Sequence, residues 1–142
     1  MNVLLIEDDP TIARSIEMLL ASEKHSCRAA ASGIEGLTLA EDAGHDIIIL
    51  DLMLPDLDGF QVLRQLKITN AAIPVLILSG LSNIEQKTKA FESGADDFLT
   101  KPFNRAELLA RVKAMGRRTE GEEGPASTGG MGSALLDAIP AG

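Results

Sequence analysis

The sequence has few aromatic residues and only one cysteine. It contains no tryptophan, no tyrosine and four phenylalanines among 142 residues, so aromatic platforms that stack single-stranded nucleic acid are not expected. Because Cys27 stands alone, it cannot form an intramolecular disulfide, and we expect a buried thiol in a reducing compartment. His25 and His45 have no further cysteine or histidine at ligand spacing, which argues against a zinc site.

Positive charge and long apolar stretches are also scarce. The net charge of −8 at pH 7 disfavours direct binding of this chain to nucleic acid. No stretch approaches the roughly 20 apolar residues of a membrane span, and "MNVLLIEDD" lacks the features of a signal peptide. We therefore expect a cytoplasmic protein without membrane contact. An apolar fraction of 45% favours a packed core.

Short apolar runs alternate with amphipathic helical patterns up to about Arg118. This alternation predicts an α/β fold around a parallel sheet, with strands at 3–6, 27–30, 47–50, 75–78 and 97–99. Five helices are predicted from the periodicity and from capping residues. Their expected starts are Pro10 after the cap Asp9, Ser32, the vicinity of Asp58, the vicinity of Ser82, and Asn104.

The composition changes after Arg118. Residues 1–118 are expected to make one domain, and residues 119–142, rich in Gly, Ser and Glu, a flexible, disordered tail. A brief apolar patch at 134–139 is either a short docking motif or terminal sequence left by a truncation.

Polar residues stand at the ends of the predicted strands. In "DIIILDLMLPDLDG" the unbroken apolar run 47–50 predicts a strand covered on both faces, and Asp51 follows it. Glu7 and Asp8 follow the first strand, Ser79 the fourth, and Lys101 the fifth. Since the carboxyl ends of parallel strands share one edge of a sheet, these side chains should converge. Three neighbouring carboxylates call for a cation, and Mg²⁺ with a phosphoryl group fits such a pocket. The simpler alternative is that Asp51 only caps its strand.

Four motifs together resemble the receiver domain of two-component response regulators, over about residues 1–118. They are "LLIEDDP", "LDLMLPDLDG", "VLILSG" and "GADDFLTKPF", in this order. The resemblance implies a flavodoxin-like, doubly wound fold: five parallel strands in the order 2-1-3-4-5 with five helices. It also implies that the chain is a phosphoacceptor signalling domain that takes a phosphoryl group from a histidine kinase or histidine phosphotransfer protein.

The resemblance assigns roles to individual residues of the site. Asp51 would be the nucleophile and would form an acyl phosphate, with Lys101 and Ser79 contacting the phosphoryl oxygens. Mg²⁺ (or Mn²⁺) would be bound by Asp8, Asp51 and the backbone carbonyl of Met53, and by Glu7 through water. Glu7 stands where many relatives have aspartate. Such a domain catalyses only its own phosphorylation and dephosphorylation, so it is not an enzyme in the ordinary sense.

The resemblance also implies a conformational switch. Ser79 would move toward the phosphoryl group while Phe98 turns inward, although Phe98 lacks the phenolic hydroxyl of many relatives and must depend on packing. The alternative is that Phe98 is permanently buried core. Lys101 and Pro102 resemble the family's cis peptide. Since Met53 and Leu81 flank the approach of water and cannot orient it, a long-lived phosphoryl group is expected.

The C-terminal third most resembles receivers of the winged-helix transcription-factor subfamily. These dimerise through the fourth helix, fifth strand and fifth helix, and the corresponding residues here are Lys87, Phe91, Glu92, Asp97, Glu107, Leu109, Arg111 and Lys113. The expected intersubunit pairs join Lys87 to Glu107, Glu92 to Lys113 and Asp97 to Arg111, around an apolar centre of Phe91 and Leu109. Thr88 departs from the aliphatic residue common there, and these charges could instead be solvated helix faces.

A DNA-binding domain is missing, so the chain is either the isolated receiver of a longer regulator or a free-standing receiver acting as a phosphorelay or protein-binding intermediate.

Other functions fit the residues less well. A haloacid-dehalogenase-type phosphatase needs an acid two residues after its nucleophile, where this chain has Met53. No P-loop or Gly-rich fingerprint follows the first strand.

Overall fold

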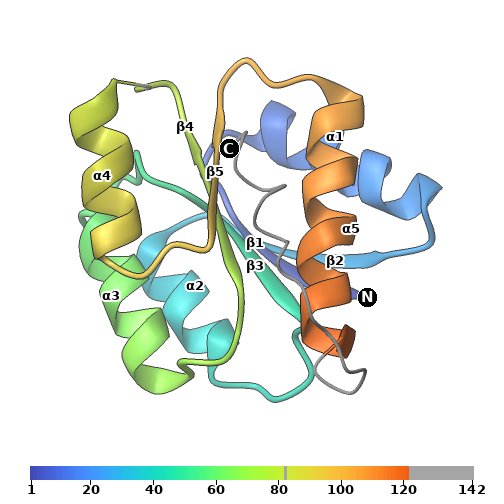
Figure 1. Ribbon diagram of the computed structural model, residues 1–142, viewed down its shortest axis with the longest axis horizontal. Coiled ribbons are helices and arrows are strands. Elements are labelled where there is room, and N and C mark those ends of the chain that lie inside the picture. The colour runs from blue at the N-terminus through green and yellow to red at the C-terminus, as the bar shows by residue number, and fades with distance from the viewer. Residues whose placement is uncertain (82, 122–142) are drawn as a thin grey trace.

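The structure is a computed structural model that describes residues 1–81 and 83–121. Strands and helices alternate along the whole of this part (Figure 1). The strands are β1 (Asn2–Ile6), β2 (Ser26–Ala30), β3 (Ile47–Asp51), β4 (Val75–Ser79) and β5 (Asp97–Thr100). The helices are α1 (Pro10–Ser22), α2 (Gly33–Ala40), α3 (Gly59–Thr69), α4 (Ile84–Glu92) and α5 (Arg105–Gly121).

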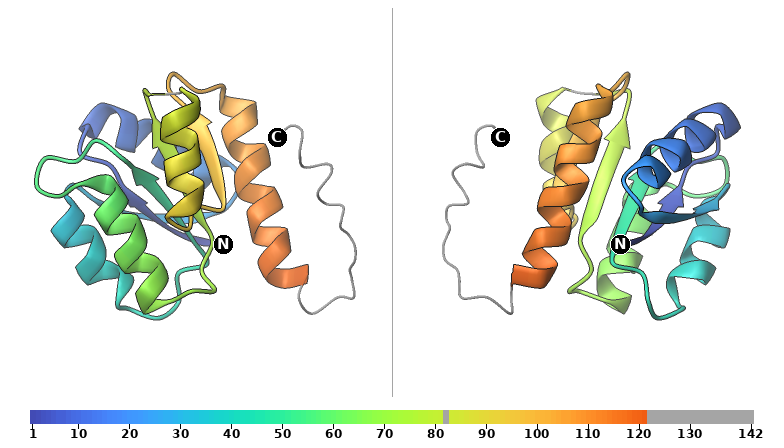
Figure 2. Two further views of the ribbon diagram at one scale, coloured as in Figure 1. Left: turned by 60° about the vertical axis from the view of Figure 1, so that its left-hand side comes forward. Right: turned by 90° about the vertical axis from the view of Figure 1, so that its right-hand side faces the viewer.

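The five strands make one parallel sheet in the order β2-β1-β3-β4-β5. Helices α1 and α5 cover one face of it, and α2, α3 and α4 cover the other (Figures 1 and 2). The predicted doubly wound fold is therefore confirmed. Asp51 and Ser79 belong to the strands that they were expected to follow, so both are held by the sheet itself.

Alternate residues of each strand enter two separate cores. In β3, Ile47 and Ile49 pack under α1 and α5, while Ile48 and Leu50 pack under α2, α3 and α4. Each fully buried side chain of this size contributes about 1.5–3 kcal/mol. Burial on both faces is why β3 and β4 read as continuous apolar runs. Cys27, expected to be buried, is only partly buried, and burial raises the pKa of its thiol to about 12.

Short polar side chains cap the helices close to the predicted starts. Each cap accepts a hydrogen bond from a backbone N–H in the first turn of its helix; the caps are Asp9, Ser32, Asp58, Asn83 and Asn104. The fourth helix was expected near Ser82, which lies outside the described residues, and it begins at Ile84 after the cap Asn83.

Helix α5 extends to Gly121, three residues into the segment predicted as a tail. The rest of that segment, with the apolar patch at 134–139, lies outside the described residues. Among the residues that the structure describes, no helix combines the length and the apolar character of a membrane span.

Candidate functional site

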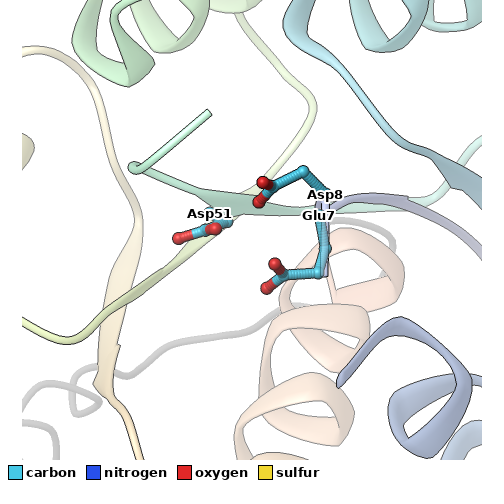
Figure 3. A group of neighbouring side chains, drawn as sticks. All are labelled: Glu7, Asp8 and Asp51. Carbon is cyan, nitrogen blue, oxygen red and sulfur yellow. The ribbon is translucent and has the colours of Figure 1, made fainter. Parts of the chain in front are cut away.

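Three carboxylates gather at the carboxyl edge of the sheet. Glu7 and Asp8 follow β1 directly, and Asp51 ends the neighbouring strand β3 (Figure 3). Glu7, Asp8 and Asp51 each offer an oxygen, and these oxygens lie within 4.8 Å of one another. Glu7 and Asp51 are only 2% exposed, whereas Asp8 is open to solvent. A buried oxygen set with one open side fits a hard divalent cation such as Mg²⁺, which keeps part of its water shell.

Lys101 brings a positive charge into this cluster from the end of β5. Its Nζ lies 2.9 Å from Oε1 of Glu7 and 3.4 Å from Oδ2 of Asp51. Its backbone N–H donates to the Ser79 carbonyl at 2.8 Å, and this bond ties the ends of β4 and β5 together. The lysine is therefore held between the first acid and the predicted nucleophile.

The cluster gathers three carboxylates, those of Glu7, Asp8 and Asp51, around the ammonium group of Lys101. Burial raises the pKa of Glu7 above its ordinary value, and the charge of Asp51 adds to this. The hydrogen bonds from Lys101 and from the Asp9 N–H oppose the rise without cancelling it. Burial lowers the pKa of Lys101, but its hydrogen bond to Glu7 and the charge of Asp51 together raise it above its ordinary value. A divalent cation would relieve this excess of negative charge.

Ser79 lies at the end of β4 and is fully buried. Its hydroxyl oxygen accepts a hydrogen bond from the Leu81 N–H at 3.0 Å. A Cβ placed on the next residue, Gly80, would have no atom of the described residues within 4 Å apart from its two chain neighbours, so there is room here for a methyl group. The hydroxyl is fixed by a single short turn beside an open region.

Met53 follows Asp51 in the loop between β3 and α3. Its backbone N–H donates to Oδ1 of Asp51 at 3.2 Å, so its main chain is directly beside the predicted nucleophile. Its side chain is 61% exposed, and that of Leu81 is 44% exposed. The two predicted flanking side chains thus reach solvent at the site.

Phe98 is buried in the core under α2, α3 and α4. The Nζ of Lys87 lies 5.8 Å from the centre of its ring. The switch hypothesis expects this inward position in the activated state. The alternative, that Phe98 is a permanent core residue, expects it in every state. The peptide between Lys101 and Pro102 is cis, as the resemblance implied.

The face made by α4, β5 and α5 lies on one side of the molecule, with β5 between the two helices (Figure 2, left). Phe91 is 48% exposed, Leu109 is partly buried, and Glu92 and Lys113 are exposed.

Arg111 pairs within its own chain: its Nη1 lies 2.8 Å from each oxygen of Asp97. Its Nη2 lies 3.0 Å from Glu107. An intersubunit pair between Asp97 and Arg111 would have to replace this internal one.

Two residues near the site are absent from the set that the sequence predicts. Asp56, in the loop before α3, accepts backbone hydrogen bonds from Gly33 and Ile34 at the start of α2. Gly59 lies so close to Leu52 that a Cβ on it would be 2.5 Å from the Leu52 Cα. The Pro-Asp and Asp-Gly pairs signal turns, but nothing local in the sequence indicates these partners.

Comparison with known proteins decides the family. The family model described as the response regulator receiver domain matches residues 3–113. The chain belongs to this family. It is 46% identical over 138 residues to the cell cycle response regulator CtrA of Brucella ovis, covering 97% of this chain and 60% of that protein. The chain therefore spans about three fifths of the length of such relatives.

Solved receiver structures share the fold. The Francisella response regulator 1452 receiver domain is 39% identical, with a TM-score of 0.79 over 83% of this chain and 98% of that one. The receiver domain of sensor histidine kinase PA1611 from Pseudomonas aeruginosa is 30% identical, with a TM-score of 0.75 over 81% of this chain and 96% of that one. That structure has a magnesium ion coordinated in its active-site cleft.

Proposed function

We propose that this receiver domain accepts a phosphoryl group on Asp51 from a histidine kinase or a histidine phosphotransfer protein. The observation that supports this most strongly is the meeting of Glu7, Asp8 and Asp51 with Lys101 at one edge of the sheet. A domain of this kind acts on itself alone, and the proposal places it in the cytoplasm, without direct binding to nucleic acid.

The residues divide the reaction among them. A carboxylate oxygen of Asp51 attacks phosphorus, an O–P bond forms as the P–N bond to the donor histidine breaks, and the imidazole leaves. Lys101 exchanges part of its contact with Glu7 and Asp51 for the equatorial phosphoryl oxygens, and the Ser79 hydroxyl donates to another. These contacts match the charge that spreads over the transferred group in its transition state.

The metal would be Mg²⁺ or Mn²⁺. Asp8, Asp51 and the carbonyl of Met53 would bind it directly, and Glu7 would reach it through water. When bound, it supplies charge neutralisation for the acids and the phosphoryl oxygens. Glu7 also keeps Lys101 beside Asp51, and its greater length than aspartate suits this contact.

The proposal is tested by incubating the chain with acetyl phosphate and Mg²⁺ and measuring its mass. We expect a gain of one phosphoryl group that is lost in Asp51→Ala and that requires the metal. Asp58→Ala, which removes a nearby acid that caps α3, is the matched control and should retain the gain. Uptake that persists in Asp51→Ala would contradict the assignment.

We further propose that phosphorylation switches the α4, β5 and α5 face, through Ser79 and Phe98, toward a homodimer or another protein. The exposed Phe91 and the charges of Lys87, Glu92 and Lys113 on this face support the proposal. Sedimentation with and without beryllofluoride tests it: we expect a dimer with the mimic, and Arg111→Ala should weaken it. A wild-type chain that stays monomeric with the mimic would refute phosphorylation-linked dimerisation.

A further inference from the structure

Asp56 fastens the loop between β3 and α3, residues 52–58, to the first turn of α2. One carboxylate oxygen accepts from the Gly33 N–H at 2.8 Å, and the other accepts from the Ile34 N–H at 2.9 Å. The hydrogen bonds from Ile34 and Gly33 lower the pKa of Asp56, so the carboxylate is ionised at neutral pH. A charged acceptor at a helix N-terminus makes stronger hydrogen bonds than a neutral one.

Packing reinforces this attachment. A Cβ placed on Gly33 would lie 3.1 Å from Cδ1 of Leu57 and 3.2 Å from its Cβ, so Leu57 already covers the start of α2 closely. At the base of the loop, Met53 pairs with Asp58 in an isolated antiparallel bridge. The loop is therefore closed at its base and attached to α2 at its tip.

Helix α2 also lies directly on β1. A Cβ on Gly36 would come within 2.5 Å of the Ile6 side chain, so the helix backbone rests on this residue. Ile6 is the last residue of β1 and immediately precedes Glu7 and Asp8. A single helix thus contacts both the strand that immediately precedes two of the acids and the loop that carries Met53.

We propose that Asp56 is a positioning residue for the metal site: by joining residues 52–58 to α2, it fixes the Met53 carbonyl relative to Glu7 and Asp8. This inference rests on the proposed function, because it concerns the same Mg²⁺ site. A ligand held before the ion arrives loses less conformational entropy on binding. Releasing the loop should therefore lower the affinity for Mg²⁺ without changing any direct ligand.

The test is calorimetric titration of Mg²⁺ into the full 142-residue chain and into Asp56→Asn, with thermal unfolding of the metal-free proteins as a check of folding. This substitution keeps one acceptor oxygen and removes the charge. Loss of a partner that orients a metal ligand typically costs 10–100-fold in affinity, and we expect about tenfold weaker binding. Leu57→Ala loosens the same attachment through packing alone, and it should also lower the affinity for Mg²⁺.

Asp42→Asn is the matched control. Asp42 lies just beyond the C-terminal end of α2, and its exposed carboxylate pairs with Arg28. Its removal should leave the Mg²⁺ affinity within about twofold of the wild-type value. The titrations are repeated in 1 M KCl, where the screening length is about 3 Å, to separate position from charge. The expected result is that the weakening in Asp56→Asn persists in high salt.

Two outcomes would overturn the inference alone: wild-type binding with an Asp56→Asn affinity equal to that of Asp42→Asn, or a weakening that disappears in 1 M KCl. A wild-type chain that binds no Mg²⁺ would overturn the proposed function as well.

Discussion

The two loops that border the site differ in how firmly they are held. Residues 52–58, after β3, are attached to α2 by Asp56 and Leu57. The Leu52 backbone also packs on Gly59 so closely that residue 59 has no room for a Cβ. After β4, a Cβ on Gly80 would contact no atom of the described residues beyond its chain neighbours, and the Leu81 N–H donates a hydrogen bond to the Ser79 hydroxyl oxygen.

This difference separates two tasks of the same site. In the proposed function the metal needs ligands in a fixed geometry, and the firmly held loop would supply one of them, the Met53 carbonyl. A switch needs a group whose position can change at low cost, and segments with few packing contacts open most easily. Met53 is therefore on the firmly held loop, and Ser79 is beside the segment with room to rearrange.

Gly59→Ala and Gly80→Ala should give the largest contrast. The added methyl at residue 59 would collide with the Leu52 backbone, and overpacking of this kind costs about 1–3 kcal/mol, at the upper end when the obstacle is main chain. At Gly80 the φ angle is not positive and space is open, so the free energy of unfolding should change by at most about 1 kcal/mol. Urea unfolding measures both, and equal losses would contradict the comparison.

The effects of Glu7→Gln and Ser79→Ala on the free energy of unfolding should depend on pH in different ways. Since the folded-state pKa of Glu7 lies above its ordinary 4.5, the folded state retains this proton where the unfolded state has lost it. The stabilisation from Glu7 is therefore greatest below 4.5 and is lost as the pH rises through the folded-state pKa, at about 1.4 kcal/mol per unit of pKa difference.

In EDTA, the free energy of unfolding of the wild type relative to Glu7→Gln should thus fall as the pH rises above 4.5. Ser79→Ala removes a buried polar group that does not titrate, so its difference from the wild type should stay constant with pH. Denaturant unfolding across this range tests both, and a wild-type advantage over Glu7→Gln that grows with pH would refute the assignment.

Met53→Asn and Leu81→Asn should show the smallest effect. Each places an amide that can orient water beside the acyl phosphate, but only residue 53 is on the firmly held loop. We expect dephosphorylation to accelerate several-fold in Met53→Asn and less in Leu81→Asn, as followed by loss of the phosphorylated mass. An unchanged or slower rate in Met53→Asn would remove the argument for a long-lived phosphoryl group.

Much of the fold was predictable because its signals are local. The apolar runs of β3 and β4 and the caps Asp9, Ser32 and Asp58 depend on neighbouring residues, and the structure has them where the sequence indicates. The gathering of Glu7, Asp8, Asp51 and Lys101 followed from the rule that parallel strands end at one edge. The partners of Arg111 were not predictable in the same way, since Asp97 and Glu107 fit pairing within or between chains equally well.

The sequence by itself determined the elements and the chemical groups at the sheet edge, and the order of the strands was implied by the resemblance to receiver domains. Periodicity, capping and strand-end position act over a few residues, so they can be read along the chain. Only the tertiary structure decided that Lys101 lies nearer to Glu7 than to Asp51, that Asp56 joins its loop to α2, and that Gly36 lets α2 rest on Ile6. These are contacts between segments far apart in sequence, and their geometry is set by how helices pack on the sheet, which no local pattern specifies.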